Sequence, residues 1–295
     1  MINTTRRRLL GGIALVGGAY GLGLATPRVV SYVEQAPFRR AIAAVLPSRP
    51  ISTGLDIGRP VARLVEAGAI DREKFLKAHE RRGPVPDWVL QALDGLPQEL
   101  ILSVETAPYH LNLLWPFGLA TRAAFNEDSP MRGDDLANFA STGGWTLGRE
   151  DNGAFYFNAV ETLTLTPDQT DMVRRLAENV FRPCCGNSAF FQDCNHGSAM
   201  LGLIELAAAS GRSSAEILEL AKVANGFWYP QEYAEIALYF DAMEDLPWKN
   251  VPADRALSAQ FSSTQGFQVN VRAQLAHRGI LAREAGNRGG SGCGV

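Results

Sequence analysis

Three of the chain's four cysteines and one of its four histidines lie in one short segment, residues 183–200. Cys184 and Cys185 are adjacent, Cys194 follows nine positions after the second, and the histidine comes two positions later. The glycine, asparagine and serine at 186–188 are turn-forming residues, so the chain can fold back and bring Cys194 beside the vicinal pair. The segment therefore predicts a tight loop that gathers three sulfur atoms, with the neighbouring helices packed around it.

A helix is predicted directly after this loop. Asp193 or Asn195 is the expected N-cap, which places Cys194 and His196 at or near the helix N-terminus. The helix dipole stabilises a thiolate in that position. His196 and Met200 are four residues apart, so they share one helix face and can approach the same atom.

These residue types indicate a metal site as the leading interpretation. Cysteine, histidine and methionine suit copper, zinc or an iron–sulfur centre rather than magnesium or calcium. Copper is favoured, because histidine and methionine are available and a four-cysteine cluster would have to recruit the distant C-terminal cysteine. The spacing matches neither paired C-x-x-C zinc motifs nor a C-x-x-C-H haem attachment. The candidate ligands are Cys184, Cys185, Cys194, His196, Met200 and Cys293.

Two other interpretations of the same residues remain open. In the first, Cys194 is a reactive thiol activated by the helix terminus and resolved by Cys184 or Cys185, as in a thiol–disulfide oxidoreductase or a redox sensor. In the second, Cys194 forms a structural disulfide with one of the vicinal cysteines, and His196 and Met200 belong to the core of a membrane-tethered helical scaffold. Motifs for nucleotide binding, zinc proteolysis and serine hydrolysis are absent from the sequence.

Composition and charge limit the class of protein. A chain of 295 residues with 46% hydrophobic content can bury a substantial core. The formal net charge is −3, and outside its first residues the sequence contains no dense cluster of basic residues. We therefore expect a globular protein whose partner is a metal ion or a redox partner, and no nucleic acid.

The first residues have the features of an export signal. A basic start is followed by an apolar, glycine-rich stretch, and no acidic residue occurs before Arg28. The run Thr5-Arg6-Arg7-Arg8-Leu9-Leu10 resembles the twin-arginine signal class, with leucine in place of the usual phenylalanine. The resemblance covers about the first 26 residues. It implies export of a folded protein to the periplasm, with inner-membrane attachment to the outer face of the cytoplasmic membrane if the segment stays uncleaved.

The remaining pattern predicts a mainly α-helical, bundle-like domain. Capping boxes are predicted at Thr166 and Ser213, and one or two short strands at 155–165. His79 is expected at the surface, and His110 is expected in the core, where a backbone carbonyl is the favoured partner and the cysteine cluster is the alternative. The predicted organisation is a signal peptide or membrane anchor at 1–27, one mainly helical domain at 28–283, and a flexible glycine-rich tail at 284–295 that carries Cys293.

Overall fold

The structure is a computed structural model that describes residues 36–281. The predicted signal or anchor at 1–27 and the tail with Cys293 lie outside the described residues. The chain divides into two compact units, residues 1–40 and 41–295. In the described part of the chain, no helix is both long and apolar enough to cross a bilayer.

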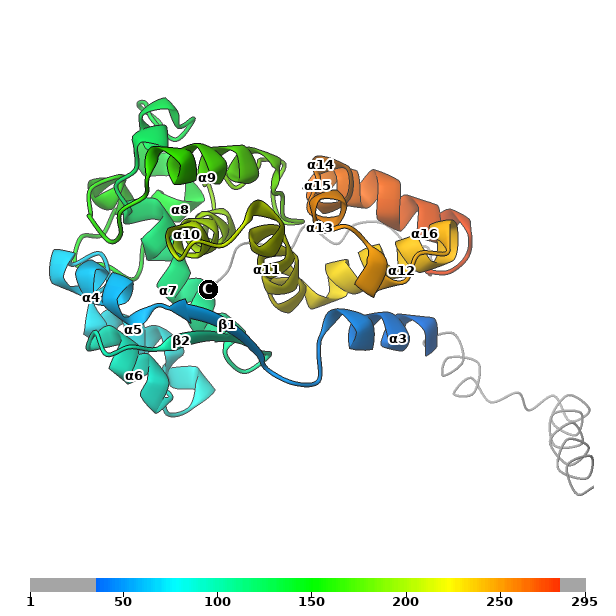
Figure 1. Ribbon diagram of the computed structural model, residues 1–295, viewed down its shortest axis with the longest axis horizontal. Helices are drawn as coiled ribbons and strands as arrows, with labels where there is room; N and C mark the ends of the chain where they lie inside the picture. Colours follow the sequence, from blue (N-terminus) through cyan, green and yellow to red (C-terminus); the bar gives the residue numbers. More distant parts are fainter. Residues whose placement is uncertain (1–35, 282–295) are drawn as a thin grey trace, which may run out of the picture. The chain divides into compact units, whose positions relative to one another are not determined.

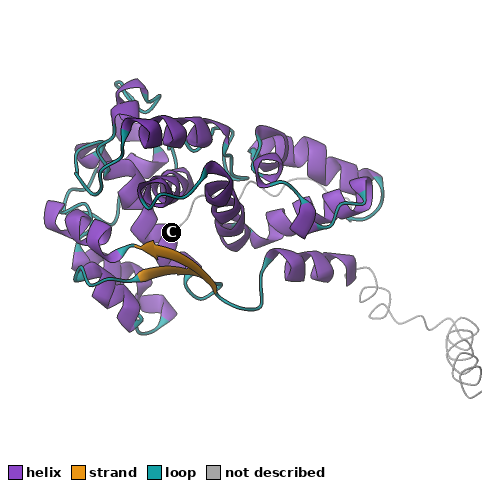
Figure 2. Cartoon of the chain, in the orientation of Figure 1, coloured by secondary structure: helices purple, strands orange, loops and turns teal. Residues whose placement is uncertain are grey.

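The described chain is mainly helical, as the sequence predicted (Figures 1 and 2). The longer helices are α3 (Ala36–Val45), α4 (Gly58–Ala67), α5 (Arg72–His79), α6 (Asp87–Leu93), α7 (Ala107–Ala120), α9 (Pro167–Asn179), α10 (Asn195–Ala209), α11 (Ser214–Trp228) and α12 (Pro230–Glu244). Short α-helical turns are α8 (Ala140–Gly143), α13 (Ala253–Ala256), α14 (Ala259–Ser262), α15 (Thr264–Gly266) and α16 (Ala273–His277). The 3-10 turns are η1 (Glu80–Arg82), η2 (Ala124–Asp128), η3 (Leu136–Asn138), η4 (Gly153–Tyr156) and η5 (Trp248–Asn250), and η6 (Phe267–Arg272) is a π-helical turn.

The described residues contain a single pair of strands (Figure 2). β1 (Ile51–Asp56) runs antiparallel to β2 (Glu99–Leu102), with a register irregularity in the middle of β1. The prediction of strands at 155–165 is wrong. The side chain of Asn152 accepts a hydrogen bond from the Ala154 amide and starts the turn η4, and Phe155 points its ring outward with 68% of its surface exposed. The turn η4 ends at Tyr156, and further along this described stretch Val160 forms an isolated bridge with Thr121 and not a strand.

The centre of the fold is the packing of α10 against α7, with α9 and α11 beside α10 (Figure 1). Both helices are apolar around most of their circumference, and residues 197–208 of α10 are buried. The two backbones touch at Gly118 and Gly202: a Cβ added at Gly118 would lie 1.9 Å from the carbonyl oxygen of Ser198. Only glycine permits such close contact. The contact sets how closely α10, which follows the cysteine loop, packs against α7.

The predicted helix starts are largely confirmed. Thr166 and Gln169 form a reciprocal capping box at α9, and Ser213 and Glu216 form another at α11. Gly211 adopts a positive φ of 83° just after α10, in the left-handed conformation that commonly ends a helix. These local signals place the starts of α9 and α11 at the expected positions.

Three titratable side chains outside the cysteine loop are buried. His79 is only 1% exposed, so the prediction of a surface position is wrong; its Nε2 atom lies 3.2 Å from the Nδ2 atom of Asn112. His110 is 1% exposed, and neither of its ring nitrogens has a hydrogen-bond partner among the described residues, so the predicted carbonyl partner is also wrong. Both oxygens of the fully buried Glu205 likewise lack a partner in this part of the chain. Burial lowers the pKa of His110 to about 3 and raises that of Glu205 well above its usual range.

Candidate metal centre

The loop between α9 and α10 brings three cysteine sulfurs into contact. The Sγ atoms of Cys184 and Cys185 are 3.4 Å apart, and the Sγ of Cys194 lies 3.7 Å from the first and 3.1 Å from the second. Each separation exceeds the roughly 2.05 Å of an S–S bond. Cys184 and Cys185 are half-buried and Cys194 is buried, so the cluster has an exposed and a protected side. The predicted folding back of the loop is confirmed, and these three sulfurs can hold one metal ion.

Backbone hydrogen bonds hold the loop at both of its ends. The Ala189 amide donates to the Val180 carbonyl at 2.8 Å, which closes the base of the loop next to α9. On the other side, the amide of Thr264 donates to the Cys185 carbonyl at 3.0 Å, and its hydroxyl donates to the Pro183 carbonyl at 2.9 Å. The vicinal cysteines are thus tied to α15, whose sequence position is far from the loop.

The N-terminus of α10 differs by one residue from the prediction. Cys194 itself occupies the N-cap, and it makes no side-chain capping hydrogen bond. Neither Asp193 nor Asn195 is the cap, because the Asp193 carboxylate is instead hydrogen-bonded to Arg182 and Asn187. The sulfur of Cys194 therefore lies at the positive end of the helix dipole, which favours its ionised form.

Arg182 is a fully buried cation beside the sulfurs, and the sequence analysis did not identify it. Its Nη2 atom is 3.4 Å from the Sγ of Cys194, 2.7 Å from Oδ1 of Asp193 and 3.3 Å from the carbonyl oxygen of Phe191. Its Nη1 atom donates to the carbonyl oxygen of Asn187. One guanidinium therefore connects both halves of the loop and places a positive charge next to the cluster.

The charges of the cluster and of Arg182 stabilise each other. Burial by itself lowers the pKa of Arg182, but the negative sulfurs of Cys194, Cys185 and Cys184 outweigh burial and raise this pKa above its usual value. For Asp193, burial raises the pKa, Arg182 lowers it and Cys194 raises it, with a net increase. A buried charge is tolerated only when it is paired, so Arg182 and the thiolates form a mutually dependent group.

Tyr229 supplies a hydrogen bond from the opposite side of the cluster. This residue lies at the junction of α11 and α12, and its hydroxyl donates to the Sγ of Cys184 at 2.8 Å. Burial, together with the charges of Cys184 and Cys194, raises the pKa of Tyr229 well above its usual value. The phenol therefore stays protonated and remains a donor to sulfur across the physiological pH range.

Of the other predicted ligands, His196 lies outside the group of three sulfurs. The ring of His196 packs against the Tyr229 ring at a tilt of 40°, with centroids 4.8 Å apart, and its buried Nδ1 atom has no hydrogen-bond partner in the described residues. The group of ligand atoms that lie within 4.8 Å of one another consists of the three cysteine sulfurs alone in this part of the chain. Met200 is fully buried on α10, and Cys293 lies outside the described residues. Within residues 36–281, the structure thus brings three of the six candidates to one point.

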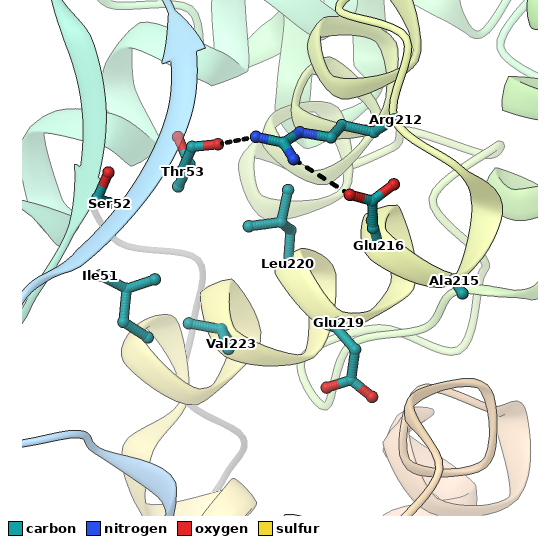
Figure 3. A pocket seen from close by; sticks show the side chains of 9 residues that line it. All are labelled: Ile51, Ser52, Thr53, Arg212, Ala215, Glu216, Glu219, Leu220 and Val223. Atoms are coloured by element: carbon teal, nitrogen blue, oxygen red, sulfur yellow. Dashed lines mark hydrogen bonds and ion pairs between the residues drawn. The ribbon is translucent and has the colours of Figure 1, made fainter.

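A separate surface pocket of about 450 Å³ lies between β1 and the first half of α11 (Figure 3). Ile51, Leu220 and Val223 form its apolar wall. Arg212 lies at one end, where it donates to the carbonyl oxygen of Thr53 and pairs with a glutamate of α11. The lining contains no cysteine and no histidine, so the pocket is not part of the metal centre.

Comparisons with known proteins found no matching family model, no similar curated protein and no similar solved structure. The function is therefore argued from the geometry of the site alone.

The sequence contains a pattern that could have identified Arg182 as part of the site, but none that could have identified Tyr229. Arg182 stands two positions before the vicinal cysteines, and a basic residue beside clustered thiols is a general signal of stabilised thiolates. Tyr229 has no such signal, because the fold of α11 brings it to Cys184 from 45 positions away.

Proposed function

We propose that this protein is exported and binds a thiophilic metal ion through Cys184, Cys185 and Cys194, for metal handling or electron transfer. The observation that carries the proposal is the mutual contact of the three sulfurs, all within 3.7 Å of one another. Thiolates select soft ions over magnesium, calcium and manganese. Arg182 and Tyr229 support the same function, because both stabilise sulfur as an anion, and the anion is the form that binds metal.

Among transition metals, copper(I) matches this donor set best. A structural zinc ion takes four ligands, so zinc would need His196, Met200 or Cys293 in addition to the three sulfurs. A four-cysteine iron–sulfur cluster would need Cys293, the one cysteine outside the loop. Copper(I) is soft and accepts three sulfur ligands without a fourth.

The test is elemental analysis of the folded, exported protein combined with a thiol count after denaturation. Near-stoichiometric metal with reduced cysteines is expected for the wild-type protein, and loss of that metal is expected for a Cys184→Ser, Cys185→Ser, Cys194→Ser triple variant. Unchanged metal content in the triple variant would end the proposal. His196→Ala, compared with His277→Ala at an exposed position, decides whether the imidazole is a ligand.

A thiol–disulfide function is the second candidate, and the short 3.1 Å separation of Cys185 and Cys194 favours it. These two sulfurs are the closest pair, so a disulfide between them needs the least movement of the loop. Metal-free protein with two thiols missing, and a Cys185–Cys194 bridge in its peptide map, would support this candidate over metal binding.

Export rests on the basic, apolar N-terminus that resembles a twin-arginine signal. We expect the protein in the periplasm or attached to the outer face of the cytoplasmic membrane. An Arg6→Lys, Arg7→Lys double variant should accumulate in the cytoplasm. Unchanged export of that variant, or unchanged export from cells whose twin-arginine machinery is disabled, would contradict this route.

A further inference from the structure

We propose that the three-cysteine cluster also captures trivalent arsenic or antimony, taken from solution as the neutral hydroxide. This inference rests on the proposed function, because both require the three sulfurs to bind one central atom. It goes further by naming an ion class that fits the spacing and the charge of the site.

The first argument is the spacing of the sulfurs. If each sulfur bonded a central atom at about 2.3 Å, the zinc–thiolate distance, a tetrahedral centre would separate the sulfurs by about 3.8 Å and a planar three-coordinate centre by about 4.0 Å. The separations here are 3.1, 3.4 and 3.7 Å. With bonds of about 2.3 Å, these separations correspond to angles of about 85°, 95° and 107° at the central atom, with a mean of about 96°. A mean angle below the tetrahedral value is that of a pyramidal, three-coordinate atom with a lone pair in the remaining direction. Arsenic(III) and antimony(III) form this geometry with thiolates.

The second argument is charge. Three thiolates carry three negative charges, which copper(I) reduces to two and zinc to one. A trivalent ion cancels all three, and Arg182 and Asp193 then balance each other as an ion pair 2.7 Å apart. Since Arg182 and Cys194 are buried, a site without residual charge has the lowest desolvation cost.

The third argument is access and chemistry. Two of the sulfurs are half-buried, so a small solute can reach them, while Cys194 closes the inner side. Capture requires no oxidant or reductant: As(OH)₃ and three cysteine thiols give one As(S–Cys)₃ centre and three water molecules. Each step breaks one As–O bond, forms one As–S bond and transfers the thiol proton to the departing hydroxide. Arsenic stays trivalent throughout.

The test uses the full-length, reduced, metal-free protein in four separate arms with arsenite, antimonite, copper(I) and zinc. Intact-mass measurement should show a gain of one arsenic or antimony atom and a loss of three hydrogens. X-ray absorption on the arsenic adduct should show three sulfur neighbours and no oxygen. Cys184→Ser, Cys185→Ser and Cys194→Ser should each lose this product, and Cys293→Ser should retain it as the matched control.

The possible failures are distinguishable. Copper(I) bound by the three cysteines without any arsenite or antimonite product would overturn this inference and leave the proposed function standing. No binding in any arm would overturn both. An adduct that keeps a hydroxyl group and loses only two thiol hydrogens, or one that needs Cys293, would also overturn the inference, because the three loop sulfurs would not then be the complete ligand set. The mass and absorption results on wild-type protein do not depend on whether any variant folds.

Discussion

The Nη2 atom of Arg182 lies between two anions, 3.4 Å from the sulfur of Cys194 and 2.7 Å from the carboxylate of Asp193. The arginine side chain is 1% exposed, so no solvent screens these interactions. A positive charge in this position joins the start of the loop to its end and compensates the thiolates before any ion binds. The metal centre therefore depends on a residue that is not one of its ligands.

Replacing Arg182 with methionine should destabilise the metal-free protein. The change keeps the side-chain volume similar but leaves the buried anions without their cation, and loss of one partner from a buried pair costs about 3 kcal/mol or more. Urea unfolding of the metal-free variant measures the loss. Arg174→Met is the matched control, because its ion pairs with Asp128 and Glu178 are exposed, and its unfolding midpoint should hardly move. Equal stability of the Arg182 and Arg174 variants would show that Arg182 does not compensate buried charge.

Tyr229→Phe should make Cys184 less reactive as a nucleophile. The variant removes the hydroxyl that donates to sulfur at 2.8 Å, and a hydrogen bond to a charged group contributes about 1.5–3 kcal/mol. A loss of this size lowers the thiolate population, so alkylation of Cys184 at neutral pH should slow by about tenfold or more. Peptide-resolved labelling with iodoacetamide measures this rate.

Tyr239→Phe is the control for this measurement, since its ring packs against Phe240 and Phe261 and no contact with the cluster involves it. If Tyr229→Phe and Tyr239→Phe label Cys184 at the same rate as wild type, the hydrogen bond has no influence on the sulfur.

The sequence predicted the parts of this centre that depend on neighbouring residues. The turn-forming residues at 186–188 predicted that the loop folds back, and the threonine and serine caps predicted where α9 and α11 begin. It did not predict that Cys194 would be the N-cap. The Asp193 carboxylate binds Arg182 and does not cap the helix, and this pairing depends on how the whole loop packs.

Long-range pairing explains the other errors. β1 and β2 are about 45 residues apart, and neither has a pattern that identifies its partner. His79 stands beside the charged run at 80–82 and was expected at the surface, yet it packs against Phe75 and the Tyr109 ring of α7. Contacts between residues far apart in the sequence, which local pattern does not encode, determined both outcomes.

The two buried histidines should make the protein less stable in mild acid. Burial, together with the charge of Arg82, lowers the pKa of His79 to about 4, and burial lowers that of His110 to about 3. Below about pH 6.5 the unfolded chain therefore binds protons that the folded chain does not, and the free energy of unfolding falls as pH falls, by about 1.4 kcal/mol per pH unit for each histidine.

Urea unfolding between pH 6.5 and 4 measures this dependence. His110→Met should reduce the slope of the free energy of unfolding against pH by the contribution of one proton. His277→Met, at an exposed position, should not. A slope that persists unchanged in His110→Met would mean that His110 is accessible to protons in the folded state.

Glu205 should have the opposite pH dependence. Its pKa is raised by burial, so the folded protein keeps a proton that the unfolded chain releases above about pH 4.5. The stability from this group is complete below the unfolded pKa and is lost as pH rises toward the folded pKa. Glu205→Met should therefore reduce the fall in the free energy of unfolding as pH rises above about 4.5. Glu219→Met, at an exposed position on α11, should leave this fall unchanged. Identical pH profiles for wild type and Glu205→Met would show that the carboxyl group finds a partner that keeps it ionised.

Gly118→Ala should damage both the fold and the metal centre, although Gly118 lies on α7 and touches no cysteine. The added methyl group would lie 1.9 Å from the Ser198 carbonyl and 2.7 Å from the Gly202 amide, so α10 must move away from α7. Overpacking against backbone costs about 3 kcal/mol. Because α10 carries Cys194 at its N-cap, the same movement displaces one sulfur from the other two, and metal binding should weaken together with stability.

Gly186→Ala is the control: it lies inside the cysteine loop, but its added methyl group meets no atom within 4 Å. If Gly186→Ala weakened metal binding more than Gly118→Ala, the loop itself, rather than the α7–α10 contact, would set the position of the sulfurs.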